Sequence, residues 1–563
     1  MARIVLPLAF AAALLLSPCV LANPPESAHL DVTNFTGIPG TCYLNSLSQL
    51  VMYDNPSITA YDAAAYSGIG TTTGWGGYPG RKALCAHPRD YTEGVEVDLL
   101  RLCGADARIC YGKGGACGRV FQRNTLGVTI LGSEADAATM LKTLVAAGTP
   151  VQVHLDMYYL PGMTTHGSHF VVVSGYDASY VYVAEGGALG TDVQVPWESF
   201  LTGWRSTPKL SPIRAYWCGP YFMCYLVSNP VKPDDKWVTA WLGLDAMMPV
   251  GDLVVGPAAM REAARALRSG KTVESVVPGL AGGVLSQGRA RIPLFFSDAG
   301  RPDIAALYGQ SADLMQSMME NPSDPALADK LDQIANAEED ALTLMQAAAA
   351  GVEPLRAFVP AGGARLSSLD AVTFHWLSLP GVKNPAVQIA MKGDFSDRKS
   401  CKTFKPKNGS WFVNMGARDW IKVLPKDGGD RQLEWRVVGT QGGIRVESTP
   451  CLLIWDAQVI AADAPADSYS FPATERVRFA WHAPAITLRP RVAISATSDF
   501  SDKRRLVYLS PIRGASEASF RATTLARLKT IDDGDGIVYW RVEDASSRLT
   551  TVQPSAPRTL NLP

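Results

Sequence analysis

Residues 33–54, "TNFTGIPGTCYLNSLSQLVMYD", place one cysteine, Cys42, where a glycine- and proline-containing turn passes into a helix. Apolar residues follow the cysteine at three- and four-residue steps, and Thr41 precedes it in the position of a helix cap. The positive end of a helix and its free N–H groups stabilise a thiolate. The stretch therefore predicts a nucleophilic cysteine, although half of a disulfide or a small buried residue would also fit it.

The cysteine count favours the nucleophile. The chain has ten cysteines, and Cys19 lies in an N-terminal segment that we expect to be removed. In an oxidising compartment the remaining odd number leaves one thiol after pairing, and Cys42 is the natural one. The other cysteines would form four bridges, with Cys110/Cys117 and Cys218/Cys224 as local loops: Cys85, Cys103, Cys110, Cys117, Cys218, Cys224, Cys401 and Cys451.

Residues 1–22 have the pattern of a cleavable signal peptide. Arg3 is followed by an uncharged apolar stretch, residues 4–16, and the segment closes on Ala22. We expect cleavage near Ala22 and export to the periplasm or the extracellular space. No later stretch reaches the roughly 18 consecutive apolar residues that a membrane span needs, so we expect no membrane-spanning helix.

The charge balance excludes two classes of partner. The chain of 563 residues carries 52 basic and 53 acidic residues, so it presents no matching field for nucleic acid or for an anionic membrane surface. The length corresponds to about four domains of roughly 150 residues. Composition separates a region of mixed helix and strand patterns at 23–228 from a helical region at 235–352.

An internal repeat follows these two regions. Trp376 recurs as Trp481, 105 residues later, and several neighbouring motifs recur at the same offset. Alternating apolar and polar runs broken by turn residues indicate two β-sandwich modules, at 365–456 and 467–563. These modules resemble fibronectin type III domains, and we expect them to bind a protein or a polysaccharide.

The repeat also bears on the disulfides. Cys401 and Cys451 of the first copy correspond to Leu506 and Ala556 of the second, so the second copy lacks both cysteines together. Joint absence is what a bonded pair predicts. The sequence therefore indicates a Cys401–Cys451 bridge.

A nucleophilic thiol needs an imidazole that accepts and returns a proton. The best candidate lies in residues 165–187, "THGSHFVVVSGYDASYVYVAEGG", which predict a β-hairpin whose first strand starts at His169. A three-residue loop would place Glu185 diagonally across from His169 on the same face, where its carboxylate can orient the ring. A two-residue loop would turn Glu185 to the other face and leave Asp177 or Asp192 as the acid.

The order of these elements is that of the papain-like fold. A cysteine helix is followed by a helix capped by Ser133 and then by strands that carry a histidine and an acid. The stretches "GTCYLNSL", "LVAAGTPVQVHLDMYYLPG" and "HFVVVSGYD" with "VYVAE" resemble the butirosin biosynthesis protein H family and, more distantly, papain-like peptidases that process bacteriocin leaders. The resemblance extends over residues 30–350 and is strongest up to about residue 226. It implies a Cys-His-acid acyl-transfer site at Cys42, His169 and Glu185.

Two features depart from those families. The acid is Glu185 where an aspartate is usual, and no glutamine precedes Cys42 at the short spacing that papain-like peptidases use for the oxyanion hole. The backbone N–H of Cys42 can serve as one oxyanion donor. Asn34 and Asn45 are the candidates for the second donor.

A zinc site is the rival interpretation of the same residues. His154, His166, His169 and Glu185 include suitable ligands, but two of the histidines stand three residues apart on a loop and a strand rather than on one helix turn. We therefore expect no metal and no cofactor. His166 is interpreted as a loop or substrate-groove residue. Asp156 is interpreted either as a structural acid that ties its strand to the site or as a group that supports the catalytic residues without being catalytic itself.

The predicted fold class is multidomain: an α+β papain-like N-terminal domain, a helical middle region and two all-β sandwich modules. The predicted function is an exported cysteine peptidase or amidase acting on a peptide, an amide or an acyl-thioester. An acyltransferase that moves an acyl group to an amine, as the butirosin family implies, is the alternative, but export separates the chain from a cytoplasmic thioester donor. A non-catalytic binding protein on a degenerate papain-like fold is a second alternative, which the two departures favour.

Overall fold

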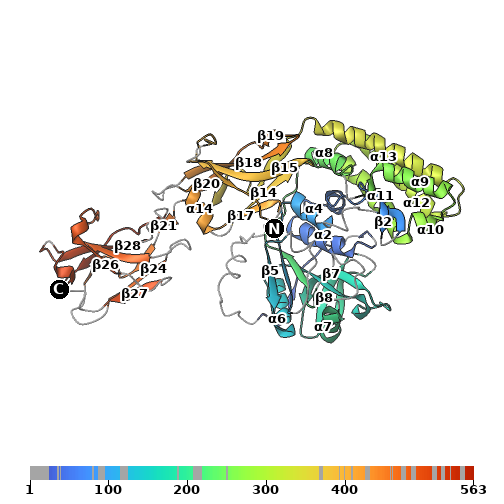
Figure 1. Cartoon of the computed structure of the whole chain (residues 1–563). Helices are drawn as coiled ribbons and strands as arrows, with labels where there is room; N and C mark the ends of the chain where they lie inside the picture. The colour runs from blue at the N-terminus through green and yellow to red at the C-terminus, as the bar shows by residue number, and fades with distance from the viewer. Residues whose placement is uncertain are drawn as a thin grey trace. The chain divides into compact units, whose positions relative to one another are not determined.

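The computed structural model divides the chain into two compact units, with the main division between Glu353 and Pro354 (Figure 1). The predicted signal peptide lies outside the described residues. The structure describes residues 24–33, 37–38, 40–78, 81–85, 95–113, 125–186, 189–206, 219–248, 252–366, 372–391, 393–397, 400–407, 410–424, 431–456, 458–459, 461–470, 477–482, 490–509, 516–520, 527–532, 534–544 and 552–562.

The first unit is built on an eight-stranded sheet with the order β5-β4-β10-β6-β7-β8-β9, in which β1 also pairs with β7. Only β4 and β5 run parallel, and the other pairs are antiparallel. Strand β7 is buried along most of its length, as its continuous apolar run predicts. The strands are β1 (Ala28–His29), β4 (Ala107–Gly112), β5 (Gly127–Leu131), β6 (Val151–Asp156), β7 (Ser168–Tyr176), β8 (Tyr180–Glu185), β9 (Gly190–Pro196) and β10 (Met223–Leu226).

Helices cover both faces of this sheet. Val153 and Val171 face the apolar core that α6 and α7 complete. Gln152 points to the opposite face, because successive side chains of a strand alternate. There its Nε2 donates to the backbone oxygen of Tyr43 in α2 over 2.8 Å. The predicted α+β domain is thus present, with α2 (Cys42–Asp54) on one face and α6 (Glu134–Ala146) and α7 (Trp197–Ser206) on the other.

The predicted helical region belongs to the same compact unit. Helix α13 buries its apolar stripe against α8, α9 and α12, with Leu331, Ile334 and Ala341 fully buried as predicted. Among the described residues, no helix is long and apolar enough to span a membrane. The elements are α3 (Ala60–Tyr66), β2 (Gly74–Tyr78), β3 (Arg81–Cys85), α4 (Val95–Leu102), η2 (Met157–Tyr159), α8 (Asp235–Asp245), β11 (Val254–Val255), α9 (Pro257–Arg268), α10 (Val273–Val276), α11 (Gly279–Asp298), α12 (Pro302–Glu320) and α13 (Leu327–Ala349).

A buried ion pair fastens these helices together. Nε of Arg289 in α11 donates to Oε1 of Glu338 in α13 over 2.6 Å, and both side chains are almost fully shielded from solvent. Ser311 of α12 donates to the same carboxylate oxygen over 2.8 Å. The Arg289 Nη2 donates to the Thr73 hydroxyl over 2.6 Å, just before β2. The network therefore links three helices to the polypeptide that leads into β2.

The second unit contains the two predicted β-sandwiches. The first has the sheets β12-β14-β17 and β13-β20-β18-β15-β16, and the second repeats them as β22-β24-β27 and β23-β30-β28-β25-β26. Trp376 and its repeat partner Trp481 are buried core residues. The strands are β12 (Leu355–Val359), β13 (Ala364–Leu366), β14 (Val372–Ser378), β15 (Val382–Met391), β16 (Lys402–Phe404), β17 (Phe412–Met415), β18 (Arg431–Gln441), β19 (Ile444–Glu447), β20 (Cys451–Trp455), β21 (Gln458–Val459), β22 (Ala461–Ala464), β23 (Tyr469–Ser470), β24 (Val477–His482), β25 (Pro490–Ser495), β26 (Leu506–Leu509), β27 (Glu517–Phe520), β28 (Ile537–Asp544), β29 (Val552–Gln553) and β30 (Arg558–Asn561); helix α14 is Ala417–Val423.

The predicted Cys401–Cys451 bridge is not formed, because Cys401 carries a free thiol. Cys401 directly precedes β16, and Cys451 begins β20, with β15 and β18 between these strands. Three strand spacings of about 4.8 Å separate the two residues, whereas a disulfide needs Cα atoms about 4.4–6.8 Å apart. The joint absence of the two cysteines from the second repeat therefore has an origin other than a disulfide between them.

The predicted Cys110/Cys117 bridge is also wrong, because Cys110 carries a free thiol. Its side chain lies on β4, fully buried, and bonds to Thr129 and Tyr225 of the neighbouring strands. Cys117 and Cys218 lie outside the described residues, and the Cys218/Cys224 pairing stays a prediction. Cys42 and Cys103 are further free thiols.

Candidate active site

Helix α2 begins at Cys42, as predicted, and leaves the thiol half-buried at its N-terminus. Thr41 occupies the N-cap position, but its side chain makes no capping hydrogen bond to the helix. The Thr41 hydroxyl instead donates to the backbone oxygen of Ile38 over 2.8 Å. The predicted cap is therefore wrong in detail, because Thr41 stabilises the turn before the helix.

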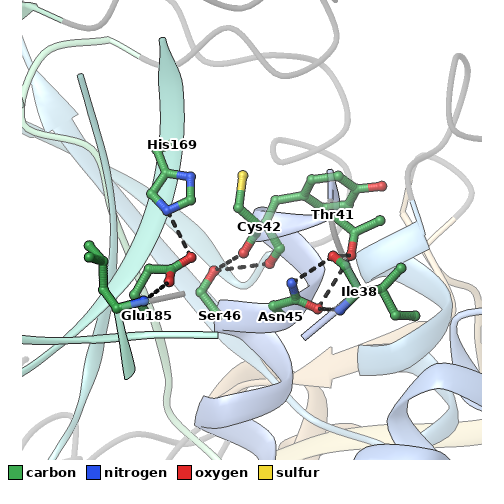
Figure 2. Close-up of polar contacts among 9 residues, drawn as sticks. Ile38, Thr41, Cys42, Asn45, Ser46, His169 and Glu185 are labelled. Atoms are coloured by element: carbon green, nitrogen blue, oxygen red, sulfur yellow. Dashed lines mark hydrogen bonds and ion pairs between the residues drawn. The ribbon is translucent and has the colours of Figure 1, made fainter. Parts of the chain in front are cut away.

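Asn45 holds that turn together from the first turn of the helix. Its Oδ1 accepts the Ile38 N–H over 3.0 Å, and its Nδ2 donates to the Ile38 oxygen over 2.9 Å. Figure 2 shows the amide turned toward Ile38 and away from the sulfur of Cys42. Asn45 therefore does not point to the site as the predicted oxyanion donor. Asn34, the other candidate, lies outside the described residues.

Two glycines bring this turn against the strand that carries the predicted acid. The Gly37 N–H donates to the Gly186 oxygen over 2.6 Å, directly after β8. A Cβ on Gly37 would lie 1.9 Å from that oxygen and 2.3 Å from Nδ2 of Asn45. Only a glycine allows the two backbones to approach this closely.

The hairpin of β7 and β8 starts one residue out of the predicted register. Tyr176 is opposite Val181 instead of Tyr180, and the Asp177 N–H donates to the Tyr180 oxygen over 2.9 Å across a two-residue turn. A β-bulge around Ser174 then takes up the extra residue. The three-residue loop predicted from the sequence was therefore wrong. The bulge restores the predicted register in the part of the hairpin that lies farther from the turn.

Beyond the bulge, Val172 is opposite Ala184, which is the predicted pairing. His169 and Glu185 consequently share one face of the sheet. Nε2 of His169 lies 3.1 Å from Oε1 of Glu185 (Figure 2). The second carboxylate oxygen of Glu185 accepts the backbone N–H of Leu189 over 3.1 Å, so this buried carboxylate is held at both oxygens.

The imidazole lies between the carboxylate and the thiol. Because Nε2 of His169 meets Glu185, Nδ1 is the nitrogen on the side of Cys42, and Figure 2 shows it facing the sulfur. Burial raises the pKa of the Cys42 thiol, but the hydrogen bond and charge of His169 and the N–H groups of Phe170 and Tyr43 outweigh burial and lower it. These contacts favour the thiolate form of Cys42.

The same contacts act on the imidazole in the opposite sense. Burial lowers the pKa of His169, but the hydrogen bonds and charges of Cys42 and Glu185 outweigh burial and raise it to about 10. A lowered thiol pKa beside a raised imidazole pKa describes a thiolate–imidazolium pair. Such a pair supplies a nucleophile and a proton donor at one place.

Neither substitute acid lies at the site. The Asp177 carboxylate accepts the N–H groups of Ser179 and Tyr180, both over 2.7 Å, and the Tyr182 hydroxyl over 2.6 Å. It therefore shapes the turn at the far end of β7 from His169. Asp192 has a left-handed backbone conformation, and its Oδ1 lies 3.3 Å from Nε2 of His29.

Asp156 and His166 form a separate pair beside the strands. Oδ2 of the buried Asp156 lies 2.7 Å from Nδ1 of His166, and Oδ1 accepts the Gly167 N–H over 3.1 Å. His166 is exposed and stacks on the exposed ring of Tyr158 at 4.3 Å between ring centres. Asp156 thus ties the end of β6 to the loop before β7.

The zinc interpretation has no support in the geometry. His154, His166 and His169 each meet a different partner: Ser168, Asp156 and Glu185. Within the part of the chain that the structure describes, no three histidine, cysteine, aspartate or glutamate side chains gather as a metal site would require.

Sequence reasoning missed several residues that shape the site. Phe170 contributes its backbone N–H to the thiol, and Gly37 and Gly186 set the approach of the two elements. His154 was considered only as a metal ligand. Gly37 stood in the predicted turn and Gly186 follows the predicted acid, but only their contact in space reveals their role.

Comparisons with known proteins support the geometry over part of the chain. Residues 105–212 match the Peptidase_C39 like family. The matched stretch includes His169 and Glu185 but begins after Cys42. It supports a cysteine peptidase-like domain, and the finer resemblance to the butirosin biosynthesis protein H family stays a prediction. No curated protein matches the chain.

Solved structures match the C-terminal region weakly. Fibronectin(III)-like modules of Clostridium thermocellum CbhA are 11% identical over 37% of this chain and 92% of theirs, with a TM-score of 0.13. A segment of two fibronectin type III domains from chicken tenascin is 9% identical over 37% of this chain and 95% of its own, with a TM-score of 0.15. TM-scores this low carry no argument, so the assignment of the sandwiches rests on their strand pairing.

Proposed function

We propose that this protein is a cysteine peptidase or amidase, with Cys42 as nucleophile, His169 as general acid and base, and Glu185 as the carboxylate that orients the imidazole. One observation carries the proposal: a thiol at a helix N-terminus meets an imidazole whose other nitrogen is bonded to a buried carboxylate. This is the arrangement that acyl transfer through a thioester requires. The Peptidase_C39 like match supports the same class of reaction.

Acylation uses both members of the ion pair. The Cys42 sulfur attacks the carbonyl carbon of a peptide or amide and forms a C–S bond, while the carbonyl electrons move to oxygen. The backbone N–H of Cys42, at the start of the helix, donates to that oxyanion. The His169 imidazolium gives its proton to the leaving nitrogen, the C–N bond breaks, and the amine departs.

Deacylation restores the resting state. The neutral His169 ring accepts a proton from water as the water oxygen attacks the thioester carbonyl. The C–S bond breaks, the acid leaves, and the thiolate and imidazolium remain. Glu185 holds the ring and stabilises its positive charge through both steps.

Hydrolysis ranks above transfer to an amine. The predicted signal peptide would place the mature chain away from cytoplasmic carrier proteins, which supply the thioester in the butirosin-type reaction. Water is then the acceptor that is always available. The two β-sandwiches would hold the enzyme on a protein or polysaccharide that accompanies its substrate.

Iodoacetamide labelling tests the proposed nucleophile, and Cys401 serves as an internal control because it is also half-buried. Burial raises the pKa of Cys401, and the largest charge effects that oppose burial come from Arg436 and Lys402. We expect Cys42 to be alkylated at least about tenfold faster than Cys401 at pH 6, since one pKa unit is a tenfold change in thiolate. His169→Ala should abolish this difference. Equal rates in the unmodified protein would refute the site.

The products distinguish hydrolase from transferase. The enzyme is incubated with a mixed peptide pool and with acyl-thioesters, each with and without an added amine, and the Cys42 adduct is weighed by mass spectrometry. We expect acid products without any amine. Products that form only with an amine would replace the hydrolase assignment by the acyltransferase.

A further inference from the structure

His154 lies on β6, beside the part of β7 that carries His169. Strands β6 and β7 run side by side, with His154 opposite Phe170. Because side chains alternate along a strand, Ser168 and Phe170 point to the same face as His154. His154 is fully buried among them.

The His154 ring contacts both chain neighbours of His169. Its Nε2 lies 2.5 Å from the hydroxyl oxygen of Ser168. Its ring plane stacks on that of Phe170, with 4.5 Å between ring centres and 29° between the planes. One side chain therefore fixes the residue before His169 and the residue after it.

The Phe170 contact reaches the nucleophile. The backbone N–H of Phe170 is one of the groups that lower the pKa of Cys42. The Phe170 ring also meets Tyr43, which follows Cys42 in α2, edge to face with 6.4 Å between ring centres. A shift of Phe170 would therefore move the N–H donor away from the sulfur.

We propose that His154 is a positioning residue that sets the contact between His169 and Cys42 by holding Ser168 and Phe170. The inference rests on the proposed function, because it concerns the same thiol and imidazole. It assigns His154 no contact with substrate.

The surroundings of His154 suit a neutral ring. Burial and then the charge of His169 lower the pKa of His154 to about 3. Its Nδ1 meets no hydrogen-bonding partner among the described residues. A second cation beside His169 would oppose the imidazolium of the ion pair, whereas a neutral ring holds the strand without adding charge.

Three substitutions separate the two contacts in the full-length chain. His154→Phe keeps a ring for stacking on Phe170 and removes the hydrogen bond to Ser168. Ser168→Ala removes the same hydrogen bond by deleting the hydroxyl. His154→Gln keeps an N–H group near the position of Nε2 but has no ring to stack. The readout is the rate of Cys42 alkylation by iodoacetamide from pH 4 to pH 9. The control is Ser48→Ala, because Ser48 is a buried serine of α2 whose hydroxyl donates to the backbone oxygen of Leu44 in its own helix, over 2.8 Å.

We expect His154→Phe and Ser168→Ala to move the acid limb of the profile to higher pH by about one unit, which slows alkylation at pH 6 about tenfold. The double variant with His154→Phe and Ser168→Ala should show little further shift of the acid limb, since the two substitutions remove the same hydrogen bond. His154→Gln should shift the limb through loss of stacking, and Ser48→Ala should leave it unchanged. If His154→Phe fails to fold, the acid limb of Ser168→Ala decides whether the hydrogen bond positions His169.

An unchanged acid limb in His154→Phe and in Ser168→Ala, with Cys42 of the unmodified protein still reactive, would overturn the role of His154 and leave the catalytic proposal standing. A fast-reacting Cys42 is therefore verified first. If the unmodified Cys42 reacts no faster than Cys401, the catalytic proposal fails and the positioning role fails with it.

Discussion

Gly37 donates its backbone N–H to the carbonyl oxygen of Gly186 over 2.6 Å, and this bond joins the turn before Cys42 to the strand end after Glu185. The nucleophile and the acid come from segments far apart in the sequence. The bond between the two glycines fixes their separation at the point where the chains meet.

Gly37→Ala should therefore disrupt the site. The new Cβ would lie 1.9 Å from the Gly186 oxygen, so one backbone must move. Overpacking of this kind costs about 1–3 kcal/mol, and a displacement of about 1 Å at a reacting group costs about 100-fold in rate. We expect Cys42 alkylation at pH 6 to fall at least tenfold, measured by peptide mass spectrometry.

Gly309→Ala is the matched control for that substitution. Gly309 lies within α12, and a Cβ there would meet no atom within 4 Å. Alanine is favoured over glycine in a helix by about 1 kcal/mol, so this variant should be slightly more stable and equally reactive. Equal reactivity of the two alanine variants would show that the Gly37 contact does not position the thiol.

Glu185→Gln should shift the pH dependence of the thiol. The carboxylate helps to raise the pKa of His169, so its removal lowers that pKa and weakens the imidazolium. The thiolate then loses part of its counter-charge, and the pKa of Cys42 rises. We expect the acid limb of the iodoacetamide profile to move to higher pH, with alkylation slower at pH 6 and similar near pH 9.

The control for this variant is Glu198→Gln, since Glu198 is an exposed acid at the start of α7. It should leave the profile in place. If Glu185→Gln also leaves the acid limb in place, the carboxylate does not act on the ion pair, and Glu185 is only a packing residue.

Asn45→Ala distinguishes a residue that holds the turn from an oxyanion donor. Asn45 makes two hydrogen bonds to Ile38 within a buried turn, and loss of a buried polar partner costs about 1–3 kcal/mol. We expect a lower midpoint of thermal unfolding together with slower alkylation of Cys42. An oxyanion donor would instead lower turnover of a peptide while leaving stability and alkylation unchanged.

Asn55→Ala provides the comparison at the other end of the same helix. Asn55 follows α2, and its Nδ2 donates to the Pro230 oxygen over 2.9 Å. This variant should lose stability to a similar degree without slowing alkylation. Slower alkylation in both variants would attribute the effect of Asn45 to general loosening of the helix.

Periodic elements could be predicted from the sequence because each depends on neighbouring residues. Ser133 caps α6 by accepting the Asp136 N–H, and the inward residues of that helix are those that its spacing indicates. The start of α2 at Cys42 follows from the turn residues before it. The β-sandwiches follow from alternation and from the internal repeat.

Register and contacts across the chain could not be predicted in the same way. The contact between His169 and Glu185 followed from a three-residue loop that the structure does not have, and a bulge around Ser174 restores the register. Gly175 in "VVVSGY" is a local signal of a bulge, because a glycine inside a strand often marks one, but it fixes neither the loop length nor the register. The Cys401–Cys451 pairing failed for a related reason: the repeat shows which residues are absent together, but strand order decides which residues are close.

The ion pair of Arg289 and Glu338 gives the last prediction, which concerns stability alone. Both side chains are buried, and removal of one partner leaves an uncompensated charge, which costs about 3–5 kcal/mol. We expect Glu338→Gln to lower the free energy of unfolding by that order in guanidinium titrations followed by circular dichroism. Asp329→Asn breaks the exposed contact with Arg268, where the two side chains are 69% and 47% exposed, and should cost less than about 1 kcal/mol. Equal losses in the two variants would mean that the buried network does not fasten α11 to α13.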